Sequence, residues 1–264
     1  MFAIGISTDF VNLPDVAGLG YDYVELPLDV LAALPEADFQ EFARYADGTG
    51  LRVGACGHML PEDLPIVGAN VNASALHGYL SHAMNRARRL GAKLLVLDAA
   101  GSRSVPAEAD YPFAWRQLGN FLRLAQGHAR DCGMTVALEP IRKADCDLLH
   151  LVSEATLIAG LLQLDNIAVA AHWGHMSMAS EPMSALRRAA PLLKYARLEN
   201  ALTLALPHPG DGEDYARMLD TLADFGYDGG VTLCGAITDA FPGEAKAALE
   251  YARQLMRYQT GDKQ

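Results

Sequence analysis

The sequence predicts a single (β/α)8 TIM barrel, and three observations lead to this fold class. Eight short apolar runs recur along the 264 residues, each bounded by turn residues. Between several of these runs, apolar residues recur at the helical spacing of three and four. No stretch rich in Pro, Gly or Ser divides the chain, so we expect one domain over residues 1–264. Alternation of strand and helix eight times over about 250 residues is typical of a closed parallel barrel.

The predicted strands are the apolar runs themselves, in the order Phe2–Ser7, Tyr23–Leu26, Leu51–Cys56, Lys93–Leu97, Thr135–Glu139, Ile167–Ala171, Leu193–Leu198 and Gly230–Cys234. Helical stripes that precede the fourth, fifth and eighth strands start at Leu76, Leu118 and Tyr215, and a last stripe starts at Ala245. We interpret these stripes as helix faces that pack on the core. A doubly wound open sheet is the alternative, but the first strand-to-helix turn, Ser7–Asn12, lacks the glycine-rich dinucleotide-binding fingerprint.

The balance of charges excludes several classes of partner. The net charge is -11 and no run of Lys or Arg stands out, so we expect no nucleic acid and no anionic membrane as partner. No apolar run approaches membrane-spanning length, and the chain enters its first strand without a basic leader. We therefore expect a cytoplasmic protein. The four cysteines are far apart and form no C-x-x-C pair, so we expect reduced thiols.

Reactive groups of a parallel barrel lie at the C-terminal ends of the strands and in the loops that follow. Ten polar residues occupy these ends in the sequence, namely Glu25, His58, Asp98, Arg103, Glu139, Arg142, His172, His175, Glu199 and Cys234. Glu139 is the most informative, because it ends the apolar run Val136–Leu138 and a buried carboxylate needs a metal, a cation or a substrate hydroxyl as partner. An ion pair with an arginine such as Arg142, or exposure at the strand end, is the structural alternative.

His172 and His175 follow the sixth predicted strand at a spacing of three. This spacing lets one ring point into the barrel mouth while the other comes from the loop, which suits a metal or a sugar hydroxyl. The alternative is a pair of hydrogen-bonded loop residues beside Trp173. Trp173 itself could form a wall for a sugar face or pack in the core.

Three further strand-end groups have two interpretations each. Cys234 is either a buried thiol or a metal thiolate. Asp98 either faces the mouth or caps the next segment. The segment Gly101–Arg103 suits a phosphate, although unspecifically, and Arg103 could equally face solvent.

With these residues the chain resembles the xylose isomerase-like barrels, a family of sugar and sugar-phosphate isomerases and epimerases that also holds endonuclease IV-type DNA repair enzymes. The resemblance covers essentially the whole chain. It rests on the segments Gly20–Glu25, Arg89–Lys93, Gly101–Arg103 with Val105–Pro106, Leu138–Pro140, Gly174–Met176, Pro209–Gly212 with Tyr215, and Gly226–Gly229.

The resemblance implies one divalent cation, often manganese, held by a glutamate, an aspartate, a histidine and a second glutamate on successive strands. Glu139 matches the first glutamate, whereas His172, Ala196 and Cys234 stand where we place the other three. A site of Glu139, His172 and Cys234, with Glu199 as a further ligand, would favour zinc over manganese because imidazole and thiolate are softer donors.

Two histidines also have counterparts in the family. His175 matches a histidine that contacts substrate, and His208 stands where many relatives have an arginine before a Pro-Gly turn. Relatives often pair through their outer helices, so the resemblance also implies a homodimer.

These observations predict an isomerase- or epimerase-like enzyme that moves a proton on a small polyhydroxylated substrate. Glu139 and His175 are the expected catalytic residues. The residues expected to bind substrate are Glu25, His58, Arg103, Arg142, Trp173 and His208. A metal-free carbohydrate-binding or regulatory barrel is the alternative, because three family ligands are replaced. The endonuclease branch is disfavoured by the charge of -11.

Overall fold

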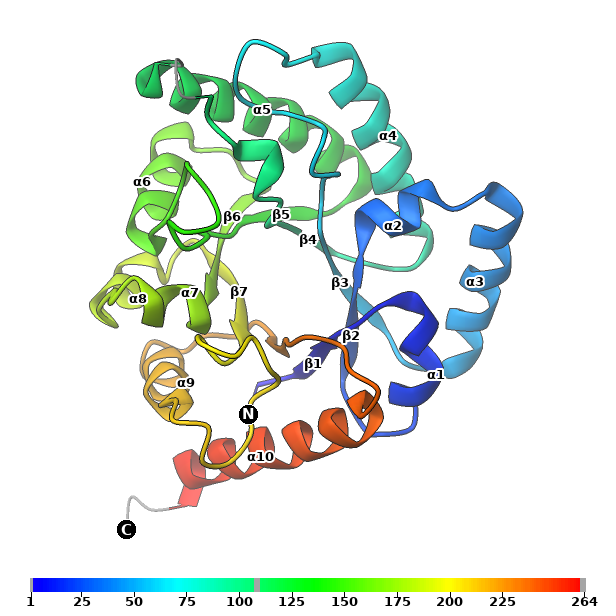
Figure 1. Cartoon of the computed structure of the whole chain (residues 1–264), viewed down its shortest axis with the longest axis vertical. Helices are drawn as coiled ribbons and strands as arrows, with labels where there is room; N and C mark the ends of the chain where they lie inside the picture. The colour runs from blue at the N-terminus through cyan, green and yellow to red at the C-terminus, as the bar shows by residue number, and fades with distance from the viewer. Residues whose placement is uncertain (1, 107–109, 262–264) are drawn as a thin grey trace.

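The structure is a computed structural model that describes residues 2–106 and 110–261. Its centre is a closed barrel of parallel strands in which neighbours in the chain are neighbours in the barrel (Figure 1). The strands are β1 (Ile4–Ser7), β2 (Tyr23–Pro27), β3 (Val53–Gly57), β4 (Leu94–Leu97), β5 (Thr135–Leu138), β6 (Ile167–His172), β7 (Leu193–Leu198) and β8 (Val231–Leu233). Parallel pairing of β8 with β1 closes the ring. The predicted fold class is confirmed, and each predicted strand overlaps an observed one.

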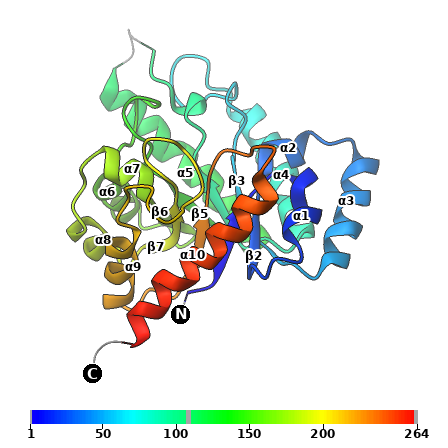
Figure 2. The ribbon, with the colours of Figure 1, turned by 60° about the horizontal axis from the view of Figure 1, so that its bottom comes forward.

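Helices surround the barrel on all sides (Figure 1). They are α1 (Leu13–Val16), α2 (Leu28–Ala33), α3 (Glu36–Thr49), α4 (Ala73–Arg89), α5 (Tyr111–Cys132), α6 (Val152–Leu162), α7 (Trp173–Met178), α8 (Ser184–Ala189), α9 (Tyr215–Asp224) and α10 (Phe241–Gly261), with 3-10 turns η1 (Phe10–Asn12) and η2 (Gly101–Arg103). The last helix, α10, packs against α1, α9 and β1 and so joins the two ends of the ring (Figure 2). In the described part of the chain, no helix has both the length and the apolar content needed to cross a membrane.

The strand side chains divide into two layers because they alternate between the two faces of the barrel wall. One face packs under the helices in a large apolar cluster. The other face fills the barrel itself with a smaller cluster, formed by Tyr23, Ala55, Val96, Ala137, Ala170 and Tyr195. Two residues further along the chain, at the ends of these strands or directly after them, stand Glu25, Gly57, Asp98, Glu139, His172 and Arg197. The alternation therefore directs the polar side chains of this second set into the barrel at its C-terminal end.

The same alternation decides which residue near the end of β7 enters the barrel. Ala196 packs in the outer cluster under the helices. The side chain that enters the barrel from this part of β7 belongs to Arg197, which bonds to groups on three other strands or strand ends. Ala196, where the sequence analysis placed the family's metal histidine, thus faces the helices, and an arginine occupies the inward-facing position of this part of β7.

Candidate functional site

Arg197 forms the centre of the site at the C-terminal mouth of the barrel. Its Nε lies 3.1 Å from Glu25 Oε2, and its Nη2 lies 2.5 Å from Glu25 Oε1. Its Nη1 lies 2.9 Å from both Asp98 Oδ2 and Glu139 Oε1. Only 6% of the Arg197 side chain is exposed, against 1%, 8% and 2% for these three carboxylates. One buried guanidinium therefore joins β2 and β7 to the residues that directly follow β4 and β5.

Glu25 is fully engaged by the protein. Besides Arg197, it accepts hydrogen bonds from the Ser7 hydroxyl at 2.9 Å and from the Tyr195 hydroxyl. Tyr195 also shares a hydrogen bond with Thr232, which in turn bonds to Tyr23 at 2.7 Å. This network secures the floor of the mouth. The predicted contact of Glu25 with substrate stays a prediction.

Glu139 differs from Glu25 because one of its oxygens is left without a partner. Oε1 accepts from Arg197, whereas the buried Oε2 has no hydrogen-bond partner. Burial raises the pKa of Glu139 to about 8, because Arg197 opposes this effect only partly and the Asp98 and Glu25 carboxylates add to it. One guanidinium cannot neutralise three carboxylates. Glu139 therefore ionises less readily than an ordinary carboxyl.

Neighbouring cations stabilise the ionised form of Asp98 more than that of Glu139. Burial raises its pKa, but Arg197 and His58 outweigh burial, so the pKa of Asp98 lies below its usual range. Its Oδ1 is buried without a partner. Asp98 thus presents an ionised acceptor beside Glu139, and it caps no helix in the part of the chain that the structure describes.

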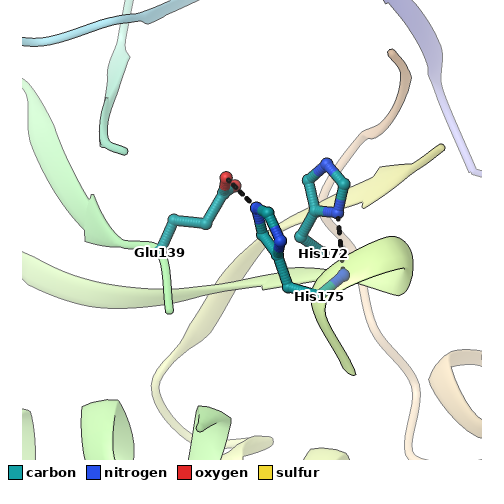
Figure 3. A group of neighbouring side chains, drawn as sticks. All are labelled: Glu139, His172 and His175. Atoms are coloured by element: carbon teal, nitrogen blue, oxygen red, sulfur yellow. Dashed lines mark hydrogen bonds and ion pairs between the residues drawn. The ribbon is translucent and has the colours of Figure 1, made fainter. Parts of the chain in front are cut away.

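The two histidines face Glu139 from the sixth strand and the short helix behind it (Figure 3). His172 ends β6 and is the N-cap of α7, since its Nδ1 accepts the backbone N–H of His175 at 3.4 Å. His175 Nε2 lies 3.9 Å from Glu139 Oε1, and the two imidazole centroids are 4.2 Å apart. On the other side, His172 Nε2 lies 3.7 Å from Glu199 Oε2.

Both imidazoles are neutral at pH 7. Burial lowers the pKa of His172 well below its usual value, with further contributions from His175 and Arg197. Burial, Arg197 and Arg142 lower the pKa of His175 to about 4. Neutral imidazoles in this place can accept a proton, bind a hydroxyl or ligate a metal.

Glu139, His172 and His175 form a group whose ligand atoms all lie within 4.8 Å of one another. One carboxylate and two imidazoles are the protein ligands of many catalytic zinc sites. The donor set therefore fits a divalent ion. Among the described residues, Cys234 is not part of this group. Its thiol donates to Thr232 O at 3.8 Å, and burial raises its pKa well above the usual value.

The two predicted arginines lie in different surroundings. Arg103 is fully buried rather than solvent-facing, and it donates from Nη1 to the backbone oxygen of Glu139 at 3.0 Å. Its Nη2 is a buried donor without a partner. Arg142 pairs with Asp145 and not with Glu139. The structural alternative, an ion pair of Glu139 with an arginine, is therefore present, but the arginine is Arg197 rather than Arg142.

Three other predicted residues lie outside the group of buried carboxylates and histidines around Arg197. His58 is exposed at the end of β3, close enough to lower the pKa of Asp98. His208 is exposed in its loop, where its ring Nδ1 lies 3.2 Å from Pro209 O. Trp173 packs in the outer cluster and donates from Nε1 to Glu213 at 2.7 Å. Their contacts with substrate stay predictions.

The phosphate interpretation of Gly101–Arg103 loses its support in the structure. The backbone N–H of Gly101 already donates to the Glu62 carboxylate. The N–H groups of Arg103 and Ser104 donate to backbone oxygens of the same turn. A negatively charged side chain thus takes the place that an anion would need.

The sequence interpretation missed Arg197, although a signal for it exists. Arg197 is a charged residue inside an apolar strand, two positions after Tyr195 and directly before the strand's last residue. Counting in steps of two from the inner layer would have placed it in the barrel mouth. The apolar appearance of the whole run hid this alternation.

Comparison with known proteins agrees with the barrel fold. A family model described as xylose isomerase-like TIM barrel matches residues 13–257. Comparison with curated proteins finds no match.

Solved structures with the same fold include several epimerases. A 3-keto-D-glucoside 4-epimerase from E. coli superimposes with a TM-score of 0.82 at 18% identity, over 96% of this chain and 100% of that chain. A D-psicose 3-epimerase from Clostridium cellulolyticum H10, solved with D-tagatose, gives 0.84 at 19% identity over 97% and 99%. An L-ribulose 3-epimerase gives 0.81 at 20% identity over 100% of both chains. At these identities the likeness establishes the fold.

Proposed function

Because this chain belongs to the xylose isomerase-like TIM barrel family, we propose that it is an isomerase- or epimerase-like enzyme acting on a small polyhydroxylated substrate. The observation that carries the proposal is the state of the Glu139 carboxyl group. Its Oε2 is buried without a partner, and its pKa is raised to about 8 beside a neutral His175. Buried acceptors and donors without partners are costly unless a ligand satisfies them.

The unpartnered groups match the chemistry of a polyol. Glu139 Oε2 and Asp98 Oδ1 can accept hydrogen bonds from hydroxyls, and Arg103 Nη2 can donate one. A small carbohydrate with hydroxyls on adjacent carbons offers both kinds of partner. We infer that the substrate satisfies these three atoms when it enters the mouth.

Glu139 is the proposed base. Removing a proton from a carbon next to a carbonyl requires a base whose pKa lies near the working pH. Burial raises the pKa of Glu139 to about 8, so its ionised form is a stronger base than an ordinary carboxylate and is still accessible near neutrality. Arg197 holds Oε1 at 2.9 Å, which leaves Oε2 to take the proton. His175, 3.9 Å from Glu139, would orient the substrate hydroxyl that flanks the reacting carbon.

The residues that would hold a divalent ion are Glu139, His172 and His175. Such an ion would supply positive charge to the carbonyl oxygen of the substrate. The acid–base roles of Glu139 and His175 are proposed for the residues themselves. They are tested without an added metal and with zinc or manganese.

Deuterium exchange tests the proposed function without knowledge of the product. The protein is incubated in D2O with a panel of ketoses, aldoses and inososes, and the loss of the C–H signal next to the carbonyl is followed by NMR. We expect exchange on at least one member and its loss in Glu139→Gln. Glu250→Gln on the exposed face of α10 is the matched control and should exchange normally. Exchange by Glu139→Gln at the rate of the unmodified protein would contradict the proposal.

A carbohydrate-binding barrel without turnover is the second candidate. It is favoured by Arg197, which already ion-pairs the carboxylate that would act as base or ligand. A sugar that raises the melting temperature but exchanges no C–H proton would support this candidate. The homodimer and the cytoplasmic location predicted from the sequence stay predictions.

A further inference from the structure

Arg197 is a fixed positive charge inside the group that could hold a divalent ion. Its Nη1 lies 2.9 Å from Glu139 Oε1, and Glu139 is also a member of the Glu139–His172–His175 group. An ion bound there would share this carboxylate with the guanidinium. The two cations would lie on the same buried side chain.

The barrel is built to hold the guanidinium in this place. Glu25 binds it through Nε and Nη2, and the Tyr195 ring lies 5.7 Å from its Cζ. Gly57, at the end of β3, leaves the space that the guanidinium needs. A Cβ at residue 57 would lie 2.6 Å from Arg197 Nη2 and 2.7 Å from Glu25 Oε1. Glu25 and Tyr195 thus hold the guanidinium in place, and it cannot move away without breaking buried hydrogen bonds.

Three carboxylates surround the guanidinium in the mouth, and their charges determine its effect on cation binding. Glu25, Asp98 and Glu139 converge on Arg197 from three directions. Carboxylates in such a cluster attract divalent cations, and a tethered guanidinium satisfies part of the same attraction. It also repels a second cation at short range.

We propose that Arg197 is a tethered cation that competes with a divalent metal ion for the carboxylates of the barrel mouth and so weakens metal binding by the Glu139–His172–His175 group. This inference rests on the candidate metal group named under the proposed function. It does not require turnover of any substrate. Arg197 is a positioning residue for Glu139, and its charge sets how strongly the mouth binds metal.

The test is a zinc titration of the full-length protein by calorimetry after removal of metals with a chelator. Arg197→Met removes the charge and keeps much of the apolar stem, whereas Arg197→Lys keeps the charge. All proteins carry His77→Ala, because His77 Nδ1 and His128 Nε2 lie 3.0 Å apart on the surface and form another imidazole pair. We expect Arg197→Met to bind zinc at least about tenfold more tightly than its Arg197 parent, as the removal of a neighbouring unit charge implies. Arg197→Lys should stay within about threefold of the parent, since the charge is retained.

A second pair of variants keeps the test decisive if Arg197→Met fails to fold. Glu25→Gln/Arg197→Met removes one negative and one positive charge together, and its parent is Glu25→Gln. The same gain in zinc affinity is expected, and His172→Ala should abolish it. Equal zinc affinity with and without Arg197 would overturn the inference, as would a gain that survives His172→Ala or that Arg197→Lys shows in full. None of these results touches the proton-transfer proposal, which the deuterium exchange of Glu139→Gln tests separately.

Discussion

Replacing Glu139 by glutamine should change how the stability of the protein depends on pH. In the folded protein the pKa of Glu139 is raised from 4.5 to about 8, chiefly because the carboxyl is buried. A raised pKa means that the folded state favours the protonated form. The stabilisation that protonated Glu139 gives the folded state is complete below the pKa of Glu139 in the unfolded chain. It is lost as the pH rises through the pKa of Glu139 in the folded chain. Glutamine resembles the protonated carboxyl in size and cannot ionise, so the variant lacks this dependence.

The magnitude follows from the two pKa values. A carboxyl with a pKa of about 8 in the folded chain instead of 4.5 lowers the unfolding free energy by about 3–5 kcal/mol as the pH rises across that range. We therefore expect Glu139→Gln to gain stability relative to the unmodified protein by about this amount between pH 5 and pH 9. Part of the gain is offset because Arg197 then loses an anionic partner at high pH.

Urea unfolding at unit intervals between about pH 5 and pH 9 measures this difference directly. The difference in unfolding free energy between the two proteins cancels the pH dependence of all other groups. Glu250→Gln on α10 provides the control, because its exposed side chain should give a constant difference. Parallel pH profiles for Glu139→Gln and the unmodified protein would refute the reasoning, since Glu139 would then ionise alike in the folded and unfolded chains.

Three other perturbations test the surroundings of Glu139. Arg197→Leu leaves three carboxylates without their shared cation and should lower the unfolding free energy in urea by about 3–5 kcal/mol. Arg187→Leu, which breaks an exposed ion pair, should lower it by less than about 1 kcal/mol. Equal losses in the two variants would contradict the buried network. Gly57→Ala should destabilise by about 1–3 kcal/mol in thermal unfolding, because its Cβ would lie 2.6 Å from the Arg197 guanidinium, and Gly78→Ala, which meets nothing within 4 Å, should not destabilise. His175 should titrate near pH 4 in an NMR experiment on its ring carbons, and a midpoint above 6 would show that the imidazole is not buried as described.

The barrel itself could be predicted because its signals are local. Each strand is a short apolar run, and the ends of the runs lie within a few residues of the observed strands, as Leu193–Leu198 shows. The choice of Glu139, His172 and His175 was equally local, since each stands at the end of a predicted strand or within four residues of it. Short-range periodicity indicates which residues reach the C-terminal end of the barrel.

The partners of these residues were decided by the tertiary structure alone. Arg142 stands three positions after Glu139 and was the partner considered from the sequence, yet it pairs with Asp145. The observed partner, Arg197, is 58 residues from Glu139 and 172 residues from Glu25. Such contacts depend on how the closed ring brings distant strands together and on which face each residue occupies. A shift of one residue along β7 exchanges Arg197 for Ala196, and with it a buried cation for a methyl group. Sequence periodicity therefore determined which groups could enter the mouth, whereas the register and closure of the barrel decided which of them meet.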